Sequence, residues 1–206
     1  MTIDWSLFVP AVLLLLFPAD RLLSANVQLR TFESFRSLEN SPRHRPWWWV
    51  PALWLDPVRG FAGTLLLKAA FALAPAEWTL RQAPTYWLLV GLLGAAVLCQ
   101  SFTGRDHEVL LAPIGFVAGI VAALMPLPVA VIGLATAMMS LFAFRRFHAF
   151  FTVGLAMIAL LGALFDTHFM WLAPAGLVLI VPLALGAIAG RTLELPTRND
   201  SGPRLS

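Results

Sequence analysis

The chain has 206 residues, of which 59% are hydrophobic and only 12% are charged. A soluble domain carries about 25% charged residues, so this chain lacks the polar residues that a water-facing surface needs. Its pI near 10.0 would favour nucleic-acid binding in a soluble protein. Most of the fourteen basic residues, however, lie outside the apolar runs and not along one face. Composition therefore excludes a soluble fold and a nucleic-acid surface, and it predicts an integral membrane protein.

The first apolar run covers residues 3–19 and is interrupted by Pro10. It is short for a membrane span, which needs roughly 20 residues, so both a span and a re-entrant path fit it. In residues 20–46, apolar residues recur at helical spacing among arginines, which predicts a cytoplasmic amphipathic segment on the membrane surface; a partly ordered loop is the alternative. Cations and indole rings near its end predict a membrane-interface anchor formed by Arg43, Arg45, Trp47, Trp48 and Trp49.

Six further apolar runs follow with short connections, and each predicts a membrane-spanning helix. Asp56 followed by Pro57 is typical of a helix start, so the first of these helices is expected to begin there. The fold prediction is an all-α polytopic membrane protein with about seven spans, or six if residues 3–19 do not cross. These spans form one domain, 1–190, and residues 191–206 form a flexible cytoplasmic tail. The six later spans are expected at 56–74, 86–102, 109–125, 127–144, 149–165 and 170–190.

The arginines predict the orientation, because short cytoplasmic connections carry the excess of Lys and Arg. With the N-terminus outside, every connection expected inside contains arginine, whereas the only basic residue in the outside connections is Arg81. Lys68 lies within a helix. We therefore predict an external N-terminus and a cytoplasmic C-terminus, in a bacterial inner membrane. The basic residues expected inside are Arg21, Arg30, Arg36, Arg43, Arg45, Arg59, Arg105, Arg145, Arg146, Arg191, Arg198 and Arg204.

The span at 56–74 has one polar side, on which Arg59 and Lys68 are the cations. Lys68 is expected near mid-helix, where a charge costs about 2.5 to 3.5 kcal/mol and normally faces a partner, a cavity or an ion path. Arg59 and Lys68 could therefore bind an anionic solute. In the alternative interpretation, Lys68 snorkels towards the interface, and Gly60 and Gly63 only admit a neighbouring helix.

Residues 107–115 and 168–176 both read His-x-x-x-Leu-Ala-Pro-x-Gly. The predicted spans place the two copies at opposite faces of the membrane, as in an inverted repeat of three plus three helices. Broken helices at these prolines would leave backbone groups free to hold a solute or ion, at Pro113, Gly115, Pro174 and Gly176. Coincidence is the alternative, because the chain is rich in Leu, Ala, Gly and Pro.

No motif predicts a catalytic residue, a metal site or a cofactor. The single cysteine, Cys99, excludes an intrachain disulfide, and neither a nucleophile elbow nor a zinc-binding His pair occurs. A small-solute or ion transporter or channel is the first functional expectation. A structural or assembly subunit of a larger membrane complex is the alternative, with partner subunits or a homo-oligomer. A lipid-modifying enzyme that uses the charged turn at residues 105–108 comes third.

Arg145 and Arg146 fall between two predicted spans on the side expected to be cytoplasmic. Paired cations at this position are typical of an anchor for anionic membrane lipid. We therefore expect lipid to be a partner of the chain, and we expect no nucleic acid.

Overall fold

The structure is a computed structural model that describes residues 3–17, 29–32, 51–72, 83–102, 110–165, 167–190 and 193–198. Within these ranges the chain forms seven helices and three short strands. In chain order they are α1 (Trp5–Leu16), β1 (Leu29–Phe32), α4 (Pro51–Phe71), α5 (Ala83–Ser101), β2 (Leu110–Leu111), α6 (Ile114–Leu124), α7 (Leu127–Phe144), α8 (Phe147–Leu164), α9 (Phe169–Ala189) and β3 (Leu193–Arg198).

Four of these helices, α5, α7, α8 and α9, are long and apolar enough to cross a membrane. The protein is therefore a helical membrane protein, as its composition predicts. The other three described helices are either shorter or more polar. α1 and α6 are apolar but have only 12 and 11 residues, and α4 has 21 residues but contains Asp56, Arg59 and Lys68.

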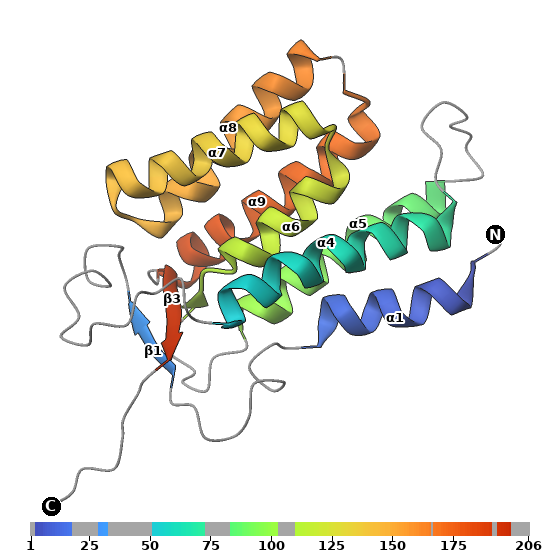
Figure 1. Cartoon of the computed structure of the whole chain (residues 1–206), viewed down its shortest axis with the longest axis horizontal. Helices are drawn as coiled ribbons and strands as arrows, with labels where there is room; N and C mark the ends of the chain where they lie inside the picture. The colour runs from blue at the N-terminus through green and yellow to red at the C-terminus, as the bar shows by residue number, and fades with distance from the viewer. Residues whose placement is uncertain are drawn as a thin grey trace, which may run out of the picture.

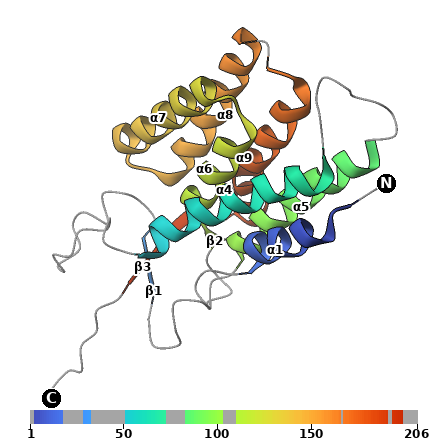
Figure 2. The ribbon, with the colours of Figure 1, turned by 45° about the vertical axis from the view of Figure 1, so that its right-hand side comes forward.

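Successive helices run in opposite directions between the two ends of the bundle (Figures 1 and 2). α1 and α4 are antiparallel, since the Asp4 N–H at the start of α1 donates to the Ala70 carbonyl at the end of α4, at 3.1 Å. The Asp4 side chain also caps α1 by accepting from Ser6. These hydrogen bonds to a fully exposed carboxylate hold the pKa of Asp4 below its ordinary value.

The three strands form one small sheet in the order β1-β3-β2, with β3 antiparallel to β1 and parallel to β2. β1 follows α1, β2 precedes α6, and β3 follows α9, so this pairing joins three chain connections at one end of the helices (Figure 1). The turn between α7 and α8 lies at the same end, because α8 contacts β3. We call this end the sheet end, and the opposite end the Lys68 end.

Basic residues gather at the sheet end. Arg30 and Arg198 lie in the paired strands β1 and β3, and Arg145 and Arg146 connect α7 to α8. Lys68, by contrast, lies in the last turn of α4. The structure thus brings together connections for which the arginine pattern predicts a common side of the membrane.

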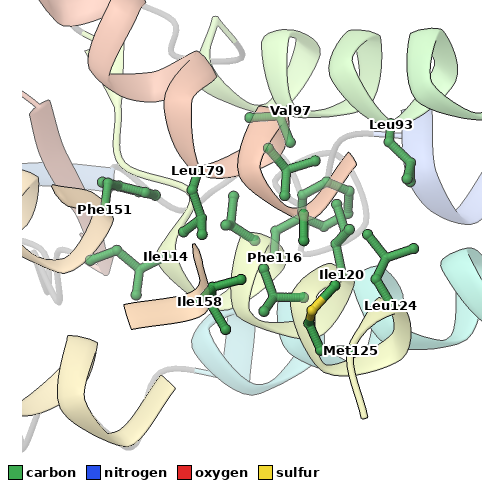
Figure 3. Close-up of a cluster of buried hydrophobic side chains, with 14 of the residues drawn as sticks. Leu93, Val97, Ile114, Phe116, Ile120, Leu124, Met125, Phe151, Ile158 and Leu179 are labelled. Atoms are coloured by element: carbon green, nitrogen blue, oxygen red, sulfur yellow. The ribbon is translucent and has the colours of Figure 1, made fainter. Parts of the chain in front are cut away.

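α6 lies at the centre of the core, where Phe116, Val117, Ile120 and Val121 are fully buried. Side chains from α5, α8 and α9 surround it, among them Leu93, Ile158 and Leu179 (Figure 3). The core is therefore assembled from helices that are distant in the sequence.

α4 runs parallel to α6, and their backbones touch at two glycines. A Cβ at residue 119 would collide with the carbonyl oxygen of Pro57, and a Cβ at residue 60 would collide with that of Phe116. Only glycine permits this approach, which is how small residues join helices in membranes.

α7, α8 and α9 pack in sequence at the other side of the core. The Ser140 hydroxyl in α7 lies 3.0 Å from the Ala149 carbonyl oxygen in α8. A Cβ on Gly133 in α7 would lie 2.5 Å from Ile158 in α8, and one on Gly162 in α8 would lie 2.6 Å from Leu172 in α9. Small residues therefore join these helices too.

Several predicted boundaries are wrong, and prolines and strand pairing explain them. α4 begins at Pro51, not at Asp56, and Pro57 lies inside it; Pro51 also suits the first position of a helix. α6 begins only after Pro113 because Leu110 and Leu111 pair with β3. The fold is helical as predicted, with a small addition that the pattern did not indicate: residues 29–32 form β1 within the predicted amphipathic segment, and residues 193–198 of the predicted tail form β3.

The helix packing does not support the inverted repeat. A repeat would make the contacts within α4, α5 and α6 resemble those within α7, α8 and α9. Instead, α4 packs along α6, whereas α7 packs along α8 and α8 packs along α9. The two motif copies also differ locally, because Pro113 precedes a helix and Pro174 lies inside one.

Gly119→Ala tests the contact between α4 and α6. The added methyl group has no space against Pro57, so we expect a loss of about 1 to 3 kcal/mol in the free energy of unfolding. The matched control is Gly91→Ala, because a Cβ there meets nothing within 4 Å and should be neutral or stabilising by about 0.5 to 1 kcal/mol. Thermal unfolding in detergent measures both variants, and equal melting temperatures would contradict the close contact.

Candidate functional site

Arg59 binds the carbonyl end of α1. This side chain is only 3% exposed. Its guanidinium donates to Asp56 Oδ1 at 2.8 Å, to the Leu14 carbonyl at 3.1 Å and to the Phe17 carbonyl. The last carbonyls of a helix lack partners within the helix and carry partial negative charge. Arg59 therefore supplies hydrogen bonds to the last carbonyls of α1 and neutralises their partial charge. Its N–H groups bind partners within the protein.

Gln100 of α5 binds the same end of α1. Its side-chain amide lies 3.5 Å from the Leu15 carbonyl oxygen and 3.4 Å from that of Phe17. Arg59 and Gln100 thus tie α4 and α5 to α1 at the sheet end. The Arg59 guanidinium also lies 5.8 Å from the centre of the Phe116 ring, which connects this polar cluster to α6.

Lys68 binds the carbonyl end of α6 in the same way. Its Nζ lies 2.9 Å from the Ala123 carbonyl oxygen and 4.4 Å from the centre of the Trp171 ring in α9. The predicted position near mid-helix is wrong, because α4 starts and ends earlier than its sequence pattern indicates. Lys68 lies in the last turn of α4, and its ammonium is directed to α6 and α9.

The predicted pathway residues lie in two places and not at one site. Lys68 binds near the end of α6, whereas Pro113 and Gly115 lie at its start. The ten residues between Pro113 and Ala123 correspond to about 15 Å of helix. Pro174 and Gly176 lie in the first half of α9, within two turns of Trp171.

The space between these two places is filled by apolar side chains in the described part of the chain. The fully buried residues there include Leu67, Val117, Ile120, Val178 and Leu179, of which Ile120 and Leu179 are labelled in Figure 3. Thr64 is the one buried polar side chain of α4 between Arg59 and Lys68, and its hydroxyl donates to the Gly60 carbonyl of its own helix. In this conformation the surroundings of α4 between the two cations are therefore mainly apolar.

The six buried polar side chains of the described residues all have partners. The hydroxyls of Thr64, Ser101 and Ser140 bind carbonyls of their own helices, and Ser140 also binds α8. Thr85 has a partner as well. Together with Arg59 and Gln100, these side chains bind the protein's own groups. Among the described residues, the Thr167 hydroxyl just before α9 is buried without a hydrogen-bond partner.

Arg145 and Arg146 lie in the turn between α7 and α8, where both are exposed. Arg145 adopts a left-handed backbone with φ 55° and ψ 30°, which costs a residue other than glycine roughly 1 to 2 kcal/mol. The equivalent cap of α9 is a glycine, Gly190. The other predicted anchor residues, Arg43, Arg45, Trp47, Trp48 and Trp49, lie outside the described residues.

The sequence pattern missed Gln100 and Trp171 as members of these clusters. Gln100 is the one amide in the apolar run that forms α5, and a polar residue in such a run is a signal that was available. Trp171 carries no such signal, because its role depends on the packing of α9 against α4 and α6.

Comparison of this chain with protein-family models, with curated proteins and with solved structures found no match. The described residues contain no group of three His, Cys, Asp or Glu side chains that could hold a metal ion. We therefore argue function from the geometry of the helices and their polar groups.

Arg59→Met tests the attachment of α1. The substitution removes the Arg59 donors to Asp56 and to the Leu14 carbonyl, and it leaves Gln100 beside the Phe17 carbonyl. The loss of these hydrogen bonds to a charged group costs about 1.5 to 3 kcal/mol. We expect faster hydrogen exchange in α1 and a lower melting temperature. Arg59→Lys should recover only part of the stability, because an ammonium lacks the planar fork.

The control for this experiment is Arg146→Gln, which removes an exposed guanidinium and should change stability by less than about 0.5 kcal/mol. If hydrogen exchange in α1 were the same in Arg59→Met as in this control, the capping role of Arg59 would be refuted.

Proposed function

We propose that the chain is a seven-span membrane protein that acts as a structural or assembly subunit of a larger membrane complex. One observation carries this proposal: the six polar residues that are buried among the described residues are bound to the protein's own groups, and only the Thr167 hydroxyl is buried without a partner there. A transporter needs polar groups that exchange partners with a solute. Here those groups form hydrogen bonds that hold the helices together, as expected for a protein with a structural role.

The proposed topology has seven spans, an external N-terminus and a cytoplasmic C-terminus. The alternating helix directions (Figure 1) and the arginines of the sheet end support it, because cytoplasmic connections carry the excess of basic residues. The sheet end is then the cytoplasmic face. A bacterial inner membrane remains the proposed location.

The helix faces that point outwards suit lateral contacts with partner helices. On α5, Gly91 is exposed with open space above it, and Trp87 and Leu98 lie on the exposed surface near it. Small residues on an exposed helix face allow another helix to approach closely. This face is therefore the proposed position of a partner helix.

The second candidate function is the passage of a small anionic solute, and Lys68 is the observation in its favour. An ammonium has three N–H donors, and the Ala123 carbonyl accepts one of them. Lys68 also lies where α4, α6 and α9 meet, so a movement of α9 would change its surroundings. The core between Lys68 and the sheet end is mainly apolar in this conformation. Passage of an anionic solute would therefore require a second conformation.

Purification in mild detergent followed by native mass determination tests the subunit proposal. We expect a second polypeptide at fixed stoichiometry. Gly91→Leu should reduce the yield of that partner without lowering the melting temperature, because the new side chain points into open space. Ala143→Leu is the matched control on another exposed helix face and should leave the partner bound. A chain that purifies alone would contradict the proposal.

Lys68→Met in proteoliposomes separates the two functions. Under the subunit proposal, wild-type protein gives no anion flux above empty liposomes, and Lys68→Met loses only about 1 kcal/mol of stability with its hydrogen bond and ring contact. Under the solute proposal, wild-type protein conducts and the variant does not. A flux that disappears in Lys68→Met at unchanged melting temperature would overturn the subunit role.

A further inference from the structure

The turn between α7 and α8 has a composition and geometry that the subunit role does not explain. Its surface combines two exposed phenylalanines at the end of α7 with two exposed arginines that follow them directly. We propose that Phe142, Phe144, Arg145 and Arg146 form a binding site for the headgroup of an anionic phospholipid. The inference depends on the membrane setting of α7 and not on the proposed subunit function.

α7 fixes the depth of this surface in the membrane. The helix is one of the four that are long and apolar enough to span, and large apolar side chains are exposed from its first residue, Leu127, to its last, Phe144 at 66%. Exposed apolar surface along a whole span must meet lipid chains. The residues that follow Phe144 therefore lie at the level of the headgroups, where phosphate is the abundant anion.

Hydrogen bonds hold the backbone of the turn, so the positions from which the two arginine side chains extend are defined. The Arg145 N–H donates to the Leu141 carbonyl at 2.8 Å, and the Ala149 N–H donates to the Arg146 carbonyl at 3.2 Å. The Ser140 hydroxyl joins α7 to α8 beside the turn. Phe147, which is only 1% exposed, anchors the start of α8 in the core.

Arg145 occupies a backbone position that favours glycine. The chain uses glycine for the same left-handed cap at the end of α9, at Gly190. An unfavourable backbone at a residue other than glycine is a known mark of functional positions. Arg145 therefore carries backbone strain that a glycine at this position would not, and the only other described residue of this kind is Ala72.

The chemistry of the arginines favours phosphate. A guanidinium presents a planar set of donors that matches two phosphate oxygens, whereas a lysine acts as a point charge. Both cations of this turn are arginines. An anionic headgroup adds net attraction to these hydrogen bonds, so phosphatidylglycerol should bind better than zwitterionic phosphatidylcholine.

The experiment measures retained lipid by native mass spectrometry of protein from mixed vesicles of phosphatidylglycerol and phosphatidylcholine. We expect Arg146→Gln and Arg145→Gly each to reduce the retained phosphatidylglycerol about fivefold. Arg145→Gly should also leave the melting temperature in lipid-free detergent unchanged or raise it, because glycine removes the backbone strain.

The control is Arg204→Gln, which removes one positive charge near the end of the chain and should leave lipid retention as in the wild type. The proposal is overturned if Arg146→Gln retains phosphatidylglycerol like the wild type, or if Arg204→Gln loses it equally, since only net charge would then matter. Displacement of the lipid by millimolar inorganic phosphate would also overturn it, because a free anion would then be the ligand.

Discussion

The backbone groups at the ends of a helix need hydrogen-bond partners, and in a membrane water cannot supply them. This requirement governs the structure. α1 and α6 have 12 and 11 residues and are about 18 Å and 17 Å long, which is shorter than the hydrocarbon core of about 30 Å. Their last carbonyls would end in a medium with no donors. α4 supplies a cation to each, Arg59 to α1 and Lys68 to α6. The charges of α4 thus permit two short helices in the bundle.

The close contact of α4 and α6 makes this arrangement possible. Lys68 can reach the Ala123 carbonyl because Gly60 and Gly119 allow the two backbones to touch. The same contact buries Phe116, which lies beside Arg59. The glycines and the cations therefore act together, because the close approach of α4 to α6 sets the position of each charge. α7, α8 and α9 use small residues in the same way but contribute no intramembrane cation among the described residues.

Much of the fold follows from the sequence, because hydrophobic length and the distribution of arginines are local signals. Residues 127–144 form α7 with the boundaries that the pattern predicts. The candidate site was harder to predict. Arg59 and Lys68 were recognised as unusual, but the carbonyls that they bind belong to α1 and α6, and no local pattern records which helix end a side chain reaches. The sheet was missed because its strands pair across more than eighty residues of chain.

The order of the sheet has a consequence for biogenesis. β3 is the middle strand, and both β1 and β2 pair with it. It is also the last of the three strands to be synthesised. β1 and β2 therefore cannot acquire these hydrogen bonds until the residues of β3 have been synthesised. The small sheet can form only after α9, the last helix before β3, has been made.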